Sequence, residues 1–373
     1  MNMAMRGQHP DRVPLMCQFS IGFMNQQLKD AGISPMELWL DAYKYVEGLL
    51  ILRERFNFDG ILVSVHGHFA DWRSKIIKLE HEQGVEIATF NNRKESYPED
   101  DLPSAKFFDA RVQDIESIRI QDIPEEISYI PSSGDCHIFI DTENPFRVFD
   151  IINEQVNGKY AIHGEVTSPF DYFLDLIGYE NALLALLLDP QKCTMILQRF
   201  TNGLVHLAEN LCEQPIDAVK ISSPFAGMGF ISPDQYLEFE QPYIRQIVES
   251  ISRSGKPSYI HTCGMIDDRL EHMRDTGTNG LECLDPPPIG NVELEDAFNR
   301  IGSEMFIKGN IDPVNILYNG NEDTISNDVR NRLQIGMQNP GFILSTACSI
   351  APKTPPENVL LLRQLVEEYG QYI

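Results

Sequence analysis

Three side chains that suit a soft metal ion stand at the ends of two apolar segments of the chain. His261 and Cys263 close the run 259–263, and Cys348 closes the run 342–348. Imidazole and thiolate are ligands that zinc prefers, and a catalytic zinc site uses three protein ligands and keeps a fourth position for water or substrate. Three such ligands on two strand ends therefore predict an open, catalytic zinc site.

The same three residues also have a simpler interpretation. Free cysteine is among the most buried residue types, and a histidine at a strand end commonly hydrogen-bonds at the rim of a core. A His-x-Cys spacing is also far less specific than a pair of Cys-x-x-Cys motifs. The zinc interpretation therefore depends on what the rest of the chain places around these residues.

Strand-like and helix-like patterns alternate along the whole chain. Short apolar runs are each followed by a segment in which apolar residues recur with helical spacing. Eight such units predict the α/β class and a (β/α)8 TIM barrel with an N-terminal extension. The expected strands are 13–19, 59–65, 160–165, 218–223, 258–261, 280–284, 305–308 and 342–346, and the expected helices include 35–56, 180–211 with a break near Asp189, 233–252, 323–337 and 356–369.

The second and third expected strands are separated by a segment that is too long for a single helical connection. Residues 74–92 have a β-hairpin pattern around Gln83 and Gly84, and 93–103 has the composition of a charged loop. We therefore expect one TIM-barrel domain over 1–373, with a β-hairpin insertion after the second strand. The insertion, at about 66–145, is expected to flank the active-site mouth, although a passive decoration is equally permitted.

Further polar side chains follow the ends of the expected strands, where the catalytic residues of this fold lie. His66 is assigned a catalytic role by this position; a metal-ligand role is the less favoured alternative to lining or hydrogen bonding in the pocket. The predicted substrate-binding residues are Glu165, Ser222, Ser223 and Asn310.

Composition limits the partners and the compartment. The formal net charge of −25 argues against a nucleic-acid backbone as partner, because such binding needs a basic face, and it also disfavours a polyanionic small substrate. The seven cysteines are odd in number and do not form a disulfide pattern, which favours a reducing cytoplasm. We find neither a secretory signal nor an apolar stretch of membrane-spanning length, so no membrane association is expected.

Four segments in the C-terminal third carry a resemblance to a known family. Together they resemble the uroporphyrinogen decarboxylase superfamily, and especially its zinc methyltransferase branch, the methylcobamide:coenzyme M methyltransferases and corrinoid-linked O-demethylase relatives. The resemblance is strong from about Ala218 onward and faint before it. The segments are 261–264 (His-Thr-Cys-Gly), 282–288 (Glu-Cys-Leu-Asp-Pro-Pro-Pro), 309–313 (Gly-Asn-Ile-Asp-Pro) and 345–348 (Ser-Thr-Ala-Cys), the last continuing through 352–358 (Pro-Lys-Thr-Pro-Pro-Glu-Asn).

The chain departs from the decarboxylases where they bind the carboxylates of their substrate. Those enzymes use arginines of an N-terminal Arg-Gln-x-Gly-Arg segment, whereas residues 17–22 here read Cys-Gln-Phe-Ser-Ile-Gly, and no arginine lies between Arg12 and Arg53. His66 and Cys348 also stand where the decarboxylases have an aspartate and a histidine. These departures favour the methyltransferase branch.

The resemblance to that branch assigns zinc to His261, Cys263 and Cys348. In that branch a fourth, displaceable ligand is acidic, and Asp285 or Glu282 occupies its place here. Both residues are expected to be catalytic. The alternative for either is a plain hydrogen-bonding role at the strand end. Zinc chemistry of this kind works together with a corrinoid (cobalamin). Because the chain lacks an Asp-x-His-x-x-Gly motif, we expect the corrinoid on a separate partner protein.

The expected function is that of a zinc-dependent methyltransferase. It would move a methyl group between a corrinoid protein and either a small methylated compound, such as a methoxylated aromatic or a methanol-type compound, or a thiol or folate. Two alternatives stay open: a decarboxylase of a carboxylated tetrapyrrole, and a noncatalytic barrel that binds a small ligand. A homodimer is permitted but not required by the sequence.

Overall fold

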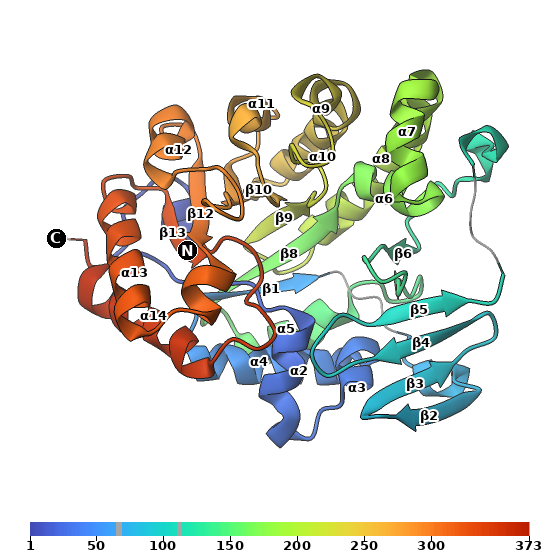
Figure 1. Ribbon diagram of the computed structural model, residues 1–373, viewed down its shortest axis with the longest axis horizontal. Coiled ribbons are helices and arrows are strands. Elements are labelled where there is room, and N and C mark those ends of the chain that lie inside the picture. Colours follow the sequence, from blue (N-terminus) through green and yellow to red (C-terminus); the bar gives the residue numbers. More distant parts are fainter. Residues whose placement is uncertain (65–68, 110–113, 373) are drawn as a thin grey trace.

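The structure is a computed structural model that describes residues 1–64, 69–109 and 114–372. Seven parallel strands form one curved sheet in the order β1-β8-β9-β10-β11-β12-β13 (Figure 1). Every described residue of β10 to β13 is buried, as expected of parallel strands that are covered on both faces. The strands are Gly60–Ser64 (β1), Ala161–Thr167 (β8), Ala218–Ser222 (β9), Ser258–Thr262 (β10), Gly280–Cys283 (β11), Phe306–Ile311 (β12) and Phe342–Thr346 (β13).

An extended segment near the N-terminus closes the sheet into a barrel. The backbone N–H of Met16 donates to the Leu344 carbonyl on β13 over 3.0 Å, and the Leu344 N–H donates to Pro14 over 2.9 Å. On the other side, the Asp59 N–H, next to β1, donates to the Leu15 carbonyl over 2.8 Å. The predicted strand at 13–19 thus occupies the eighth position, and the TIM-barrel prediction is confirmed.

Helices surround the sheet, and two of the predicted ones are divided. The predicted helix 35–56 is interrupted at Asp41, whose carboxylate accepts from two backbone N–H groups of the next helix. The predicted helix 233–252 is interrupted at Glu240, because Pro242 has no N–H to continue the helical hydrogen bonds. The predicted break near Asp189 is present.

The α-helices are Asn2–Met5 (α1), Ile21–Leu28 (α2), Pro35–Leu40 (α3), Ala42–Phe56 (α4), Arg147–Val156 (α5), Pro169–Ile177 (α6), Tyr179–Leu188 (α7), Pro190–Cys212 (α8), Pro233–Phe239 (α9), Gln241–Arg253 (α10), Leu270–Arg274 (α11), Leu294–Ile301 (α12), Glu322–Gly336 (α13) and Pro356–Tyr369 (α14). Shorter helical turns are Lys29–Ala31 (η1), Trp72–Lys75 (η2), Ile115–Ser117 (η3), Ile120–Asp122 (η4), Asp267–Arg269 (η5) and Pro313–Tyr318 (η6). Among the described residues, none of these helices is long and apolar enough to cross a membrane.

The insertion between β1 and β8 contains more strands than the sequence predicted. Its antiparallel sheet is formed by Lys78–Glu82 (β2), Val85–Thr89 (β3), Arg93–Tyr97 (β4) and Ser104–Phe107 (β5), and it lies beside the barrel near α3 (Figure 1). A small ribbon, Tyr129–Ile130 (β6) with Ile138–Phe139 (β7), follows.

The prediction of a charged loop at 93–103 was wrong for its first half. Glu95 and Tyr97 on β4 are both buried, and the Glu95 carboxylate is paired with Arg93, whose Nε lies 2.5 Å from Oε1. An inward-facing position that carries a charged residue conceals the alternation of apolar and polar residues by which a strand is recognised. The predicted single hairpin is therefore the first half of a four-stranded sheet.

Candidate metal centre

The three predicted ligands lie together at the carboxyl end of the barrel strands. His261 lies on β10, Cys263 directly follows that strand, and Cys348 follows β13. His261 Nε2 is 3.3 Å from Cys263 Sγ, which is 3.7 Å from Cys348 Sγ. The imidazole is buried, both cysteines are half-buried, and all three residues line one cavity. A small molecule that enters this cavity would therefore meet the sulfur atoms.

A fourth soft side chain, Cys283, joins this group and was missed by the sequence analysis. Its sulfur and the ligand atoms of His261 and Cys263 all lie within 4.8 Å of one another. Cys283 is the last residue of β11 and, like the following Leu284, has a positive φ, so the chain leaves its extended path there. The signal that could have found it is the one used for Cys348: an apolar strand that ends on a cysteine.

Glu282 lies behind His261, on the side of the ring away from the sulfur atoms. Its Oε2 is 2.9 Å from His261 Nδ1 and 3.5 Å from Lys220 Nζ, and its Oε1 accepts from Lys308 Nζ. Burial alone would raise the pKa of Glu282, but the charges of Lys308 and Lys220 and the hydrogen bond with His261 outweigh it and hold that pKa well below its usual value. The carboxylate thus holds the proton on Nδ1 and leaves Nε2 free to face the cysteines.

The cysteine thiols differ in how readily they ionise. Hydrogen bonds from Cys283 and then Cys348 lower the pKa of the Cys263 thiol well below its usual value, against the effect of burial. The hydrogen bond to Cys263, together with burial, raises the pKa of Cys348. Because the thiolate is the form that binds metals, Cys263 is the sulfur ligand that this site prepares first.

Asp285 has one oxygen bound and one without a partner. Its Oδ2 accepts a hydrogen bond from the Gly264 N–H over 2.6 Å, whereas Oδ1 is buried and has no hydrogen-bond partner among the described residues. Burial raises the pKa of this carboxyl above its usual value. A buried acceptor without a donor is costly, and a cation or a proton would satisfy it.

This donor set fits a zinc ion. Imidazole and thiolate ligands bind zinc in preference to magnesium or calcium. Here the imidazole also has its second nitrogen held by a carboxylate, as is usual for a histidine that binds a metal. Asp285 and Cys283 both offer a fourth ligand, whereas both oxygens of Glu282 are already engaged by cationic or N–H groups. Glu282 is therefore placed to orient His261.

The cavity above these residues has a volume of about 460 Å³, and most of its wall is apolar. Two of the predicted substrate-binding residues line it. Glu165 accepts a hydrogen bond from Ser64 Oγ over 2.5 Å and lies 3.0 Å from Lys220 Nζ, and Ser222 lines the cavity at the end of β9. The apolar lining includes Phe19, Met24, Tyr45, Leu49, Tyr179 and Phe225.

The other predicted residues are engaged elsewhere. Ser223 Oγ donates to Glu240 Oε1 over 2.5 Å, and Asn310 donates to the Leu284 carbonyl over 2.8 Å and accepts from Arg332. Neither is among the described residues that line the cavity. His66 lies outside the described residues.

Two buried carboxyl groups beside the cavity were also missed by the sequence analysis. Asp171, which lines the cavity, accepts a hydrogen bond from Ser168 Oγ over 2.7 Å. Burial raises the pKa of Asp171 well above its usual value, and burial raises the pKa of Glu240 to about 7. Nothing in the sequence marks them, because Asp171 lies in the first turn of α6 and Glu240 at the break before α10, where acidic residues are ordinary.

Glu240 makes the stability of the protein depend on pH. Its folded pKa of about 7 lies above the ordinary value of 4.5, so the folded state binds the proton more tightly. The associated stability is present below pH 4.5 and is lost as the pH rises through about 7, by about 3 kcal/mol in total. The free energy of unfolding, measured with urea, should therefore decline between pH 5 and pH 8, and we expect Glu240→Gln to remove the part of this decline that comes from Glu240. Glu238→Gln, on the exposed face of α9, is the control; an unchanged slope in Glu240→Gln would contradict the assignment.

The fold and this site define a class: a (β/α)8 barrel with a histidine–cysteine cluster at the carboxyl end of its strands. The uroporphyrinogen decarboxylase (URO-D) family matches residues 112–369, which is more than half of the chain. The chain belongs to this family, as the resemblance in its C-terminal third predicted.

Individual relatives within the match are of two kinds. Methylcobamide:CoM methyltransferase MtbA of Methanosarcina acetivorans is 26% identical over 220 residues, which cover 59% of this chain and 61% of that protein. Uroporphyrinogen decarboxylase 2 of Oryza sativa is 26% identical over 221 residues, 57% of this chain and 54% of that protein. The matches thus span about three fifths of the relatives' length or less, and both kinds of relative are enzymes.

A solved structure resembles the whole chain. The methyltransferase from Methanosarcina mazei superposes with a TM-score of 0.72 at 20% identity, covering 98% of this chain and 96% of that one. At this identity the likeness establishes the fold, including the region before residue 112 that the family match leaves out.

Proposed function

We propose that this protein is a zinc-dependent methyltransferase that exchanges a methyl group between a small substrate and a corrinoid carried by a partner protein. The observation that carries the proposal is the cluster of His261, Cys263 and Cys348, which line a largely apolar cavity and have Cys283 beside them. The names of the methylcobamide:CoM methyltransferase relatives support the same chemistry.

The chain's own residues divide the work. His261, Cys263 and Cys348 would hold the ion, Asp285 or Cys283 would occupy its fourth position until substrate arrives, and Glu282 orients His261. A zinc ion supplies Lewis acidity, which either keeps a thiol as thiolate at neutral pH or polarises the oxygen that bears a methyl group.

The cavity would assist the reaction by excluding water and by offering a carboxyl group as a proton donor. Its apolar walls limit access of water to the sulfur atoms, which strengthens electrostatic interactions inside. Burial raises the pKa of the Asp171 carboxyl well above its usual value, which favours its protonated form, and this carboxyl lines the wall from which a departing oxygen could take a proton. This arrangement favours an oxygen-bound methyl group, such as that of a methoxylated aromatic or a methanol-type compound, over a thiol or folate.

A decarboxylase is the second candidate, because relatives of that kind match equally well. Among the described residues that line the cavity, Lys220 is the single side chain with a permanent positive charge, and it is already paired with Glu165. A substrate with several carboxylates would meet no arginine there, which disfavours this candidate.

The proposed function can be tested with purified protein by measuring its zinc content and the absorbance of methylcobalamin as methylcobalamin is consumed or formed. A panel of methoxyarenes, methanol, methylamines and thiols is supplied as donor or acceptor. We expect about one zinc per chain and turnover with at least one member of the panel. Conversion of uroporphyrinogen without cobalamin chemistry would instead identify a decarboxylase, and inactivity with both would favour a ligand-binding barrel.

Three further proposals concern the setting of this activity. We propose that residues 1–373 act as one domain in which about 66–145 flank the mouth of the cavity. The free cysteines favour a reducing cytoplasm. A homodimer is compatible with the function, which needs the corrinoid protein as its docking partner.

A further inference from the structure

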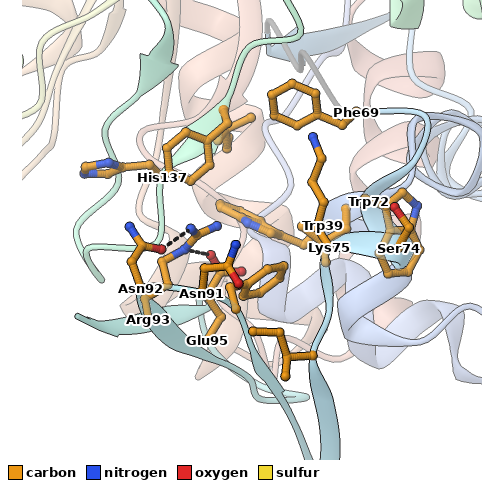
Figure 2. Close-up of a pocket in the computed structure, with 15 residues that line it drawn as sticks. Trp39, Phe69, Trp72, Ser74, Lys75, Asn91, Asn92, Arg93, Glu95 and His137 are labelled. Atoms are coloured by element: carbon orange, nitrogen blue, oxygen red, sulfur yellow. Dashed lines mark hydrogen bonds and ion pairs between the residues drawn. The ribbon is translucent and has the colours of Figure 1, made fainter. Parts of the chain in front are cut away.

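A second cavity, of about 550 Å³, lies between the insertion and α3, and several aromatic side chains form part of its wall (Figure 2). It has the size expected for a small-molecule site. Trp39 of α3 and Ile138 of β7 line both this cavity and the one above the metal centre, so the two are neighbours. The aromatic rings that face it are Trp39, Phe69, Trp72, Phe90 and Phe139.

Two cations stand against these rings. Arg93 Cζ lies 4.6 Å from the centroids of both Phe90 and Phe139, and Lys75 Nζ lies 3.2 Å from the Phe69 ring (Figure 2). Cations held on aromatic faces keep part of their positive field for a ligand, because the ring does not neutralise the charge. The cavity therefore combines stacking surfaces with positive charge.

The acidic groups nearby cancel this charge only in part, because Glu95 is paired with Arg93 whereas the acidic partner of Lys75 is exposed. Glu95 is the single acidic residue among the described lining residues, and its two oxygens are occupied by Arg93 Nε and the Tyr97 hydroxyl. Asp71 Oδ1 is 3.3 Å from Lys75 Nζ, but both side chains are well exposed, so this pair is weak. Two cations and one acid leave the described lining with a net positive charge, although the net charge of the chain is −25. The cavity therefore suits an anion.

We propose that this cavity is a binding site for a small aromatic carboxylate, whose ring contacts Trp39 and Trp72 and whose carboxylate faces Arg93 and Lys75. Asn91 and Asn92 offer amide groups to further polar substituents on the ring. The site contains none of the candidate metal ligands, so it stands or falls separately from the proposed methyl transfer. Methoxybenzoates and hydroxybenzoates, a methylated substrate and its demethylated product, share the chemistry that this site recognises.

The two tryptophans of the chain are natural reporters, because both line this cavity. In Trp39→Phe the remaining fluorophore, Trp72, does not line the cavity above the metal centre. We expect saturable quenching of Trp72 by meta-methoxybenzoate or meta-hydroxybenzoate, corrected for absorbed light with N-acetyltryptophanamide. Methoxybenzene, which has no charge, and cyclohexanecarboxylate, which has no aromatic ring, should each bind about tenfold more weakly or worse.

Charge-removing variants test the cations. Lys75→Gln and Arg93→Gln in the Trp39→Phe background should weaken benzoate binding about tenfold, whereas Arg253→Gln, on the exposed face of α10, should not. Lys75→Gln leaves no buried partner behind, so it remains informative if Arg93→Gln fails to fold.

Metal removal separates the two sites, since binding at this cavity should survive treatment with a chelator. Preference for the methoxy or the hydroxy compound would assign the site to substrate or to product. Absence of saturable binding, equal affinity for methoxybenzene, or loss of binding with the metal would overturn the proposal.

Discussion

Replacing Cys263 by serine is expected to remove bound zinc and abolish methyl transfer. The Cys263 sulfur is at the centre of the cluster, 3.3 Å from His261 Nε2 and 3.7 Å from Cys348 Sγ, and it is the thiol whose pKa is lowered. A serine hydroxyl does not ionise in the same range and is a poor zinc ligand. The loss should exceed the roughly 10–100-fold effect that follows removal of a group behind a metal ligand.

Metal content by mass spectrometry and cobalamin absorbance are the two measurements for this variant. Cys212→Ser is the matched control, because Cys212 is a cysteine buried in the outer helix α8. Full zinc occupancy and normal turnover in Cys263→Ser would remove Cys263 from the centre.

The same measurements rank the candidates for the fourth ligand. Asp285→Ala and Cys283→Ala should each keep zinc through His261, Cys263 and Cys348, and the one that supplies the fourth ligand should alter turnover the more. In cobalt-substituted protein, Cys263 and Cys348 retain a thiolate-to-metal absorption band in both variants. A weaker band in Cys283→Ala than in wild type would identify Cys283 as the fourth ligand, and an unchanged intensity would favour Asp285.

The barrel and the position of the three predicted ligands could be read from the sequence for one physical reason. Parallel strands of a barrel all end at the same face, so side chains at strand ends meet although they are far apart in the chain. His261, Cys263 and Cys348 satisfy this rule. So do Glu165 and Ser222, which line the same cavity.

Other parts of the site depend on features that a one-dimensional pattern does not contain. In a regular strand, Glu282 and Cys283 would point to opposite faces of the sheet. In the structure both side chains lie near the metal centre, and the backbone at Cys283 has a positive φ, which departs from regular strand geometry. The burial of Lys220 and Lys308 depends on pairing with acids from other strands, and a lone lysine in an apolar run does not reveal its partner. Ser223 is diverted from the cavity by Glu240, which is buried where Pro242 interrupts a helix.

The second large effect should come from Glu282→Leu, which is expected to lower the free energy of unfolding by about 3–5 kcal/mol. Glu282 is the acid that contacts Lys308, and both side chains are almost completely buried. Lys220 retains its 3.0 Å contact with Glu165, but the ammonium of Lys308 would be left buried without an anion among the described residues. A buried charge without a partner costs far more than the pair contributes.

The test compares urea unfolding of Glu282→Leu, of Glu282→Leu combined with Lys308→Met, and of Glu295→Leu, an exposed control on α12. The double variant should recover most of the stability, because it removes the isolated charge as well as its partner. The pKa of Glu282 lies below its ordinary value of 4.5, so its contribution is present above that pH and lost as the pH falls through the folded pKa. The difference between wild type and Glu282→Leu should therefore narrow in acid. A loss below about 1 kcal/mol at neutral pH, or a double variant no more stable than the single one, would show that Lys308 does not depend on Glu282.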